Sequence, residues 1–165
     1  VILPGVGAFK SGMKFLKETH FTDQLYNYLE TPNSLIYGIC LGMQLLFNKS
    51  YEFVETKGLG LIDGSVVKFP NNKANITHLG WNKLNIKEKN FKEDFKKFEN
   101  KYFYFVHSYY AKPRLKNDIF SISRYGAINF CSAIKRGNIF GTQFHPEKSG
   151  NLGIEFLKHL KKLKS

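Results

Sequence analysis

The sequence has few cysteines, few arginines and no long apolar run. Its 165 residues include only Cys40 and Cys131, and neither stands in a CxxC or Cys/His pattern. A disulfide framework and a metal site of the usual spacing are therefore excluded, and we expect two free thiols in the cytoplasm, with no cofactor. No run of about 18 apolar residues and no basic-then-apolar N-terminal pattern occurs, which argues against a membrane span or secretion.

Positive charge is abundant, but lysine carries most of it. The formal net charge is +12, from 25 Lys and Arg against 13 Asp and Glu. A positive charge of this size is typical of proteins that bind nucleic acid. The only arginines, however, are Arg114, Arg124 and Arg136, and the basic residues do not alternate with aromatic ones as they do in a nucleic-acid-binding groove. We interpret the charge as a solvated lysine-rich surface, without nucleic acid or membrane as partner. An acidic protein partner, steered by a basic face, is the alternative.

The first half of the chain alternates apolar runs with amphipathic segments, an order that predicts an α/β fold. Val1 to Leu3 predicts a buried strand, and residues 35–39 predict a second one. Between them, residues 12–30 show helical spacing of apolar side chains, with Thr22 as the cap of a second helix inside this stretch.

The second half is predicted to be rich in β-strands. Short alternating runs, bounded by glycine, asparagine and lysine, occupy residues 64–69, 102–111, 119–125 and 139–144. The segment "LGIEFLKHLKKL" at 152–163 predicts an amphipathic closing helix. With 42% hydrophobic residues, the chain is long enough for one core, and we expect a single domain over 1–165.

One cysteine stands where a nucleophile is commonly presented. In "GICLGMQLLF", Cys40 follows an apolar strand-like run, precedes an apolar helix-like run, and has Gly38 and Gly42 nearby. This pattern is typical of a nucleophile elbow, and the helix N-terminus is expected to lower the pKa of the thiol. Cys131, in "INFCSAI", is interpreted as a small buried hydrophobe.

A cysteine nucleophile needs a base and a group that orients the base. In "QFHPEKS", the proline after His145 favours an extended backbone, in which side chains two residues apart point the same way. Glu147 is therefore expected to reach the His145 ring. His78 and His107 receive no assignment from the sequence.

The segment "PGVG" at 4–7 follows the first predicted strand and is a candidate oxyanion hole. Glycine in this segment permits backbone conformations that aim the N–H groups of Val6 and Gly7 at a negative oxygen, and the N–H of Leu41 would supply a further donor. The alternative is an ordinary turn.

Together these motifs resemble the class I, triad-type glutamine amidotransferases, which carry "PGVGAF", "GICLGMQLLF" and "QFHPEKS" in this order. The segments "KGLGLIDGSVVKF", "HLGWN" and "YFYFVHSYYA" narrow the resemblance to the glutaminase subunits of imidazole glycerol phosphate synthase, an enzyme of histidine biosynthesis. The resemblance covers essentially the whole chain. It implies a three-layer, flavodoxin-like α/β fold with a mostly parallel central sheet and a β-rich second half.

The resemblance also implies a role for each matching residue. Cys40 would attack the side-chain amide of glutamine to form a glutamyl thioester and release ammonia, with His145 as base and acid and Glu147 orienting it. The residues implied to bind glutamine are Gln44, Glu52 for the α-amino group, and the backbone around Ser108 and Tyr109 for the carboxylate.

In such enzymes the ammonia passes to a (β/α)₈-barrel cyclase subunit within a heterodimer. The positions implied to lie near that interface are Trp81, Asn82, Tyr104 and Lys148. A core aromatic is the alternative interpretation of Trp81. Members of the family normally carry a further strand, a helix and the start of a second strand before "VILPGVG", about 40 residues, so we expect this N-terminal unit to be missing here.

Three rival functions remain open. A paralogue could feed ammonia to a different synthase, such as one that modifies a surface or nucleotide sugar, because the partner chooses the acceptor. A non-catalytic basic binding module is disfavoured by the intact Cys40, His145 and Glu147. A stand-alone hydrolase or protease with the same triad is disfavoured by Gln44 and by "HLGWN".

Overall fold

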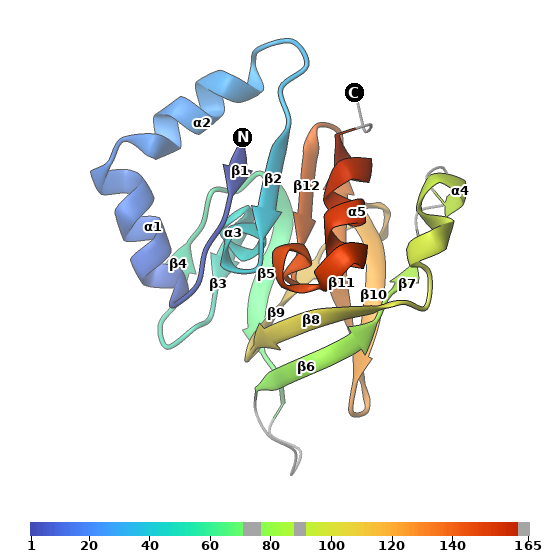
Figure 1. Ribbon diagram of the computed structural model, residues 1–165. Helices are drawn as coiled ribbons and strands as arrows, with labels where there is room; N and C mark the ends of the chain where they lie inside the picture. Colours follow the sequence, from blue (N-terminus) through green and yellow to red (C-terminus); the bar gives the residue numbers. More distant parts are fainter. Residues whose placement is uncertain (71–76, 88–91, 162–165) are drawn as a thin grey trace.

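The centre of the molecule is a six-stranded mixed sheet (Figure 1). The computed structural model describes residues 1–70, 77–87 and 92–161. The strand order is β1-β2-β12-β11-β10-β7. The strands are β1 (Ile2–Leu3), β2 (Ile36–Ile39), β7 (Asn85–Ile86), β10 (Ile119–Tyr125), β11 (Ile128–Arg136) and β12 (Ile139–Thr142).

This sheet is less parallel than the sequence predicts. β2 pairs in parallel with β1 and with β12, whereas β12–β11, β11–β10 and β10–β7 are antiparallel. Two-residue turns at 126–127 and 137–138 join β10 to β11 and β11 to β12, each with a glycine of positive φ. Such short turns permit only antiparallel neighbours, while β2 is reached through helices. The predicted α/β class with a β-rich second half is confirmed.

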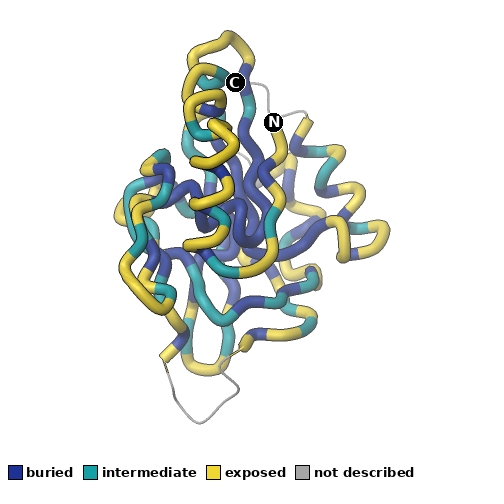
Figure 2. The backbone as a smooth tube through the Cα atoms, turned by 90° about the vertical axis from the view of Figure 1, so that its left-hand side faces the viewer, coloured by how far each residue is buried: buried dark blue, intermediate teal, exposed yellow. Residues whose placement is uncertain are grey.

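Two cores lie on the two faces of this sheet. Met13 of α1, Leu25 of α2 and Ile36 of β2 belong to one core, while Tyr37 of β2 and Phe156 of α5 belong to the other. Successive residues of β2 thus serve opposite faces, as the pleat requires. Figure 2 shows the buried strands at the centre and the exposed outer sides of the helices. The helices are α1 (Phe9–Glu18), α2 (Phe21–Leu29), α3 (Leu41–Leu45), α4 (Lys92–Phe95) and α5 (Gly150–Leu160).

Two smaller sheets complete the layers. A four-stranded sheet of order β4-β3-β5-β9 packs on the side of α1 to α3, and the hairpin-like pair β6/β8 packs on the side of α5. Their strands are β3 (Phe47–Ser50), β4 (Thr56–Lys57), β5 (Ile62–Lys68), β6 (His78–Lys83), β8 (Tyr102–His107) and β9 (Tyr109–Pro113). In the part of the chain that the structure describes, 3₁₀ turns occur at Lys96–Phe98, Lys116–Asp118 and Pro146–Lys148. Within the described residues, no helix is long and apolar enough to cross a bilayer.

Three local predictions need correction. The strand at Val1 to Leu3 is buried only at Leu3, because the described chain pairs β1 with β2 on one edge alone. The second helix within 12–30 exists, but His20, at a φ of 56°, precedes it, and Thr22 lies inside it without a cap bond. The closing helix begins at Gly150, and the predicted positions 162 and 163 lie outside the described residues.

A glycine in α3 sets how closely this helix approaches β1. A Cβ atom added at Gly42 would lie 1.7 Å from the carbonyl oxygen of Leu3. We expect Gly42→Ala to lower the free energy of unfolding by about 3 kcal/mol or more, because relief requires the backbone of β1 or α3 to shift. Denaturant titration measures the change. Gly12→Ala in α1 is the matched control, since its Cβ would meet only leucine side-chain atoms. Equal stability of the two variants would contradict the expectation.

Candidate functional site

Cys40 lies at the junction between β2 and α3, as the sequence predicts. Its backbone has φ 52° and ψ −108°, a rare conformation for a residue with a side chain. The Cys40 N–H donates to the carbonyl of Thr142 at 2.7 Å, which ties the turn to β12. At Gly38 a Cβ would come within 2.6 Å of the Met43 nitrogen, so the turn requires glycine there. This strained strand-to-helix turn has the geometry of a nucleophile elbow.

The electrostatic setting of the Cys40 thiol differs from the prediction. Burial raises the pKa of Cys40 to about 11, more than the Leu41 N–H and the Gln143 side chain lower it. The Gln143 Nε2 lies 3.6 Å from the sulfur. The predicted lowering of the pKa is wrong because α3 has only five residues and the sulfur is largely withdrawn from water. At neutral pH Cys40 is therefore a thiol and needs a base.

The His145 ring is held in the orientation of a general base. Its Nδ1 lies 2.7 Å from Glu147 Oε1, and its main-chain N–H donates to the Tyr104 carbonyl at 2.9 Å. The buried Nε2 has no hydrogen-bond partner within the described part of the chain. The predicted contact with Glu147 is present, and His145 has the predicted extended backbone, with φ −102° and ψ 92°. The extended conformation does not continue to Glu147, because Pro146–Lys148 form a 3₁₀ turn. A carboxylate on Nδ1 favours the tautomer that leaves Nε2 free to accept a proton.

One cavity of about 400 Å³ gathers most of the predicted site. Nine predicted residues line it: Val6, Gly7, Cys40, Leu41, Gln44, Glu52, Ser108, Tyr109 and His145. Glu147 lies outside it and lines a neighbouring cavity with His145. No three metal-ligating side chains come together among the residues that the structure describes.

Two of the residues predicted to bind the substrate glutamine, Gln44 and Glu52, are held in place by hydrogen bonds within the protein. Gln44 Nε2 donates to the Tyr109 carbonyl at 3.0 Å and to Gln143 Oε1 at 2.9 Å, so its own carbonyl oxygen is the atom available to a ligand. Glu52 Oε2 accepts the N–H of Phe9 at 2.5 Å, at the start of α1. A carboxylate at a helix N-terminus is favourably placed, and Glu52 lines the cavity from that position.

Five residues that line the cavity or contact Cys40 received no site assignment from the sequence: Phe53, Thr77, Val106, His107 and Gln143. Gln143 is buried and contacts Cys40, and its position two residues before His145 at the end of β12 was an available signal. His107 lines the cavity from the end of β8. Phe53 also lines it, with a φ of 58°, an exposed fraction of 87% and its ring 6.5 Å from that of Tyr109. Nothing in the sequence around Phe53 indicated this placement.

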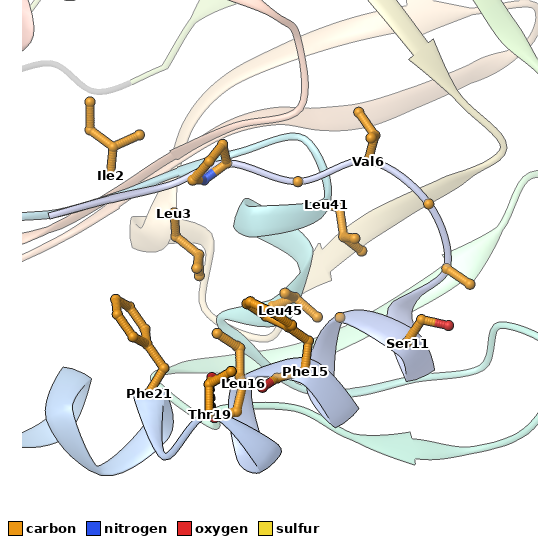
Figure 3. Close-up of a pocket in the computed structure, with 15 residues that line it drawn as sticks. Ile2, Leu3, Val6, Ser11, Phe15, Leu16, Thr19, Phe21, Leu41 and Leu45 are labelled. Carbon is orange, nitrogen blue, oxygen red and sulfur yellow. Dashed lines mark hydrogen bonds between the residues drawn. The ribbon is translucent and has the colours of Figure 1, made fainter.

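A larger cavity of about 800 Å³ lies beside the first and is lined mostly by apolar side chains (Figure 3). Phe15 and Phe21 reach it from α1 and α2, and Leu45 reaches it from α3. Val6, Gly7 and Leu41 line both cavities, so the predicted oxyanion segment separates them. The described residues that line the larger cavity include no thiol, imidazole or charged side chain, whereas Cys40, Glu52 and His145 line the smaller one.

Three of the four residues predicted to lie near the partner interface are found near His145. The fourth, Asn82, lies on the opposite face of β6. Trp81 is 55% exposed, so its interpretation as a core aromatic is wrong, and its ring lies 6.0 Å from that of Tyr104. The Tyr104 ring lies 6.4 Å from the His145 ring, and Lys148 is exposed three residues further on. The Asn82 side chain is half-buried and donates to the Arg124 carbonyl at 2.8 Å, on the opposite face of β6.

The fold and the site together define a class of protein. The family model described as glutamine amidotransferase class-I matches residues 1–160, and the chain belongs to that family. The subunit HisH of imidazole glycerol phosphate synthase from Carboxydothermus hydrogenoformans is 46% identical over 166 residues, covering 99% of this chain and 79% of the relative. The HisH subunit from Chlorobium luteolum is 42% identical over 160 residues, covering 96% and 78%. Within class I, the chain thus falls in the HisH family, and the predicted resemblance is confirmed.

Solved structures share the fold at low sequence identity. The structure of PurLQS from Thermotoga maritima aligns with a TM-score of 0.69 at 18% identity, covering 98% of this chain and 78% of that one. The glutaminase domain of Trypanosoma brucei CTPS with bound acivicin aligns at 0.55 and 16% identity, covering 99% and 71%. These likenesses confirm the predicted amidotransferase fold.

Proposed function

We propose that the chain hydrolyses glutamine to glutamate and ammonia and supplies the ammonia to a cyclase partner in histidine biosynthesis. The single observation that carries the reaction is the cavity that holds the Cys40 thiol and the His145 ring together with Gln44 and Glu52. A nucleophile, a base and polar groups for an amino acid are what the reaction requires. The family of HisH subunits supports the pathway.

The first half of the reaction forms a thioester. The Nε2 of His145 takes the proton from Cys40, and Glu147 stabilises the imidazolium through Nδ1. The sulfur attacks the side-chain amide carbon of glutamine, and the negative oxygen meets the N–H groups of Leu41 and of the Val6–Gly7 segment. His145 then protonates the leaving nitrogen as the C–N bond breaks, which releases ammonia and leaves a glutamyl thioester.

The second half regenerates the enzyme. Nε2 of His145 removes a proton from water, the oxygen attacks the thioester carbon, and the C–S bond breaks as the sulfur recovers that proton. Glutamate leaves the cavity. The same base serves both halves because its Glu147 contact holds the ring in one orientation throughout.

The outer face of β6/β8 is the proposed docking surface for a (β/α)₈-barrel cyclase. Its exposed apolar side chains are Leu79, Trp81 and Tyr102, with the half-buried Tyr104 beside His145. A contiguous aromatic face at the edge of a catalytic site is typical of a protein interface. Docking there would let ammonia leave on the side of His145 and Lys148 without passing through solvent.

Two further expectations stay proposals. Residues 1–165 form a single amidotransferase domain, which the sharing of one sheet by both cores supports. The protein works in the cytoplasm, which the free thiols of Cys40 and Cys131 support. A paralogous synthase as partner remains the second candidate, because the glutaminase cavity does not select the acceptor.

Glutamate release from glutamine tests the function, measured for the chain alone, with a histidine-pathway cyclase, and with the cyclase and its nucleotide ligand. We expect strong release only in the ligand-bound complex. Trp81→Ala should weaken binding of the cyclase by about tenfold or more, whereas Leu115→Ala, at an exposed apolar residue after β9, should not. Silence of a proven complex would overturn the histidine assignment.

A further inference from the structure

We propose that His78 and His107 are a positioning pair that fixes the amide of Gln44 beside Cys40. The inference deepens the proposed glutaminase function and rests on it. Neither histidine has a role in the triad, yet both are buried, and His107 lines the cavity with Cys40. The register of β6 and β8 places the two directly opposite each other.

A continuous series of hydrogen bonds joins the pair to the cavity. His78 Nδ1 lies 3.0 Å from His107 Nε2, and His107 Nδ1 lies 2.7 Å from the Tyr109 carbonyl oxygen. The same carbonyl accepts Nε2 of Gln44 at 3.0 Å. On the far side of the pair, Asn82 Nδ2 lies 3.1 Å from His78 Nε2. The Tyr109 carbonyl thus accepts hydrogen bonds from both His107 and Gln44, and so connects the histidine pair to Gln44.

The ends of this series determine where each proton lies. A carbonyl oxygen only accepts, so His107 must carry its proton on Nδ1 and, in the neutral ring, accept on Nε2. His78 must then donate from Nδ1 and accept on Nε2 from the Asn82 amide. Asn82 Nδ2 also faces the Arg124 carbonyl and Asn82 Oδ1 accepts the Lys83 N–H, so its amide orientation agrees with this assignment.

Burial keeps both rings neutral, which this proton arrangement requires. It lowers the pKa of His78 to about 4 and that of His107 to about 3, so neither carries charge at physiological pH. A second proton on either ring would place two N–H groups face to face along the series. Aromatic neighbours pack against the pair, with the Phe105 ring 4.8 Å from His78 and the Phe130 ring 5.2 Å from His107.

The effect of the pair reaches the thiol through two amides. The Tyr109 carbonyl and Gln143 Oε1 together accept both protons of the Gln44 amide, which turns the Gln44 carbonyl oxygen toward a ligand. Gln143 then directs its own Nε2 to the sulfur of Cys40, 3.6 Å away. Release of the Tyr109 carbonyl from His107 would let the Gln44 amide turn over and reverse this order.

Two substitutions at His107 separate positioning from packing. Asparagine places its amide nitrogen where Nδ1 was, and so keeps a donor for Tyr109 but loses the contact with His78. Glutamine reaches the position of Nε2, and so keeps a partner for His78 but loses the donor for Tyr109. We expect the KM for glutamine to be about tenfold higher in His107→Gln than in His107→Asn, in the cyclase complex.

Stability should not follow the same order. If packing and the contact with His78 set stability, His107→Gln is at least as stable to denaturant as His107→Asn, although its KM is higher. A purely structural role predicts that activity falls with stability in both variants. A KM ratio near one, or a ratio that follows the stability order, would overturn the proposal.

A spectroscopic test does not depend on activity. Nitrogen-15 NMR of the histidine rings at neutral pH should show the Nδ1–H tautomer for both His78 and His107 in the full chain. An Nε2–H tautomer or a charged ring at either position would overturn the pairing. Glutamate release by the wild type in the same complex distinguishes the proposed glutaminase function from the proposed histidine pair. A wild type that releases no glutamate counts against the glutaminase function. An active wild type with the other tautomers counts against the histidine pair alone.

Discussion

Replacing Cys40 with alanine is expected to lower glutamate release in the cyclase complex by at least about 10³-fold. The cavity offers the Cys40 sulfur beside the His145 ring, so its loss removes the covalent intermediate altogether. Steady-state glutamate formation measures the effect. Binding of glutamine should persist, because Gln44 and Glu52 keep their own contacts in the absence of the thiol.

Cys131 supplies the matched control for this experiment. It is a free cysteine like Cys40, but it lies in β11, and burial strongly raises the pKa of its thiol. Its Sγ donates to the Ala133 carbonyl at 3.3 Å, away from the cavity. Cys131→Ala should therefore keep glutaminase activity and lose only some stability. Activity that survives Cys40→Ala but falls in Cys131→Ala would contradict the assignment of the nucleophile.

The position of Cys40 was predictable because local sequence determines it. An apolar run of strand length, a cysteine near two glycines and an apolar run of helix length can hardly be arranged otherwise than as a strand-to-helix turn. The pKa of the thiol was not predictable in this way. It depends on how much water reaches the sulfur, which segments far apart in sequence decide together, including Val106, whose carbonyl lies 3.9 Å from it.

The contact between His145 and Glu147 was predicted correctly, but the predicted extended backbone is present only at His145. A spacing of two residues brings side chains together in an extended strand, but here the 3₁₀ turn Pro146–Lys148 does so. Trp81 and Asn82 show the converse difficulty. They are adjacent in sequence and were assigned together, yet the pleat of β6 directs them to opposite faces. The hydrogen bond between His78 and His107 joins two strands that are far apart in the sequence, so no local pattern could predict it.

Glu147→Gln is expected to lower kcat by about 10³-fold while the KM for glutamine changes little. Glutamine is nearly the same size, but its amide nitrogen can donate to Nδ1 of His145, which Glu147 Oε1 cannot do. That contact would favour a proton on Nε2, the atom that has to accept the proton of Cys40. In this variant the His145 ring therefore keeps its position but carries its proton on the wrong nitrogen.

The fold should tolerate this change, which keeps the test interpretable. The Glu147 side chain is 44% exposed, so loss of its charge should alter the free energy of unfolding by no more than about 1 kcal/mol. Glu155→Gln is the control, since Glu155 forms an ion pair with Lys97 at 2.9 Å on the exposed side of α5. Its kcat should equal that of the wild type. A kcat for Glu147→Gln within about threefold of the wild type would mean that the carboxylate does not set the His145 tautomer. The buried Nε2, which has no hydrogen-bond partner among the described residues, would then suffice alone to make His145 a base.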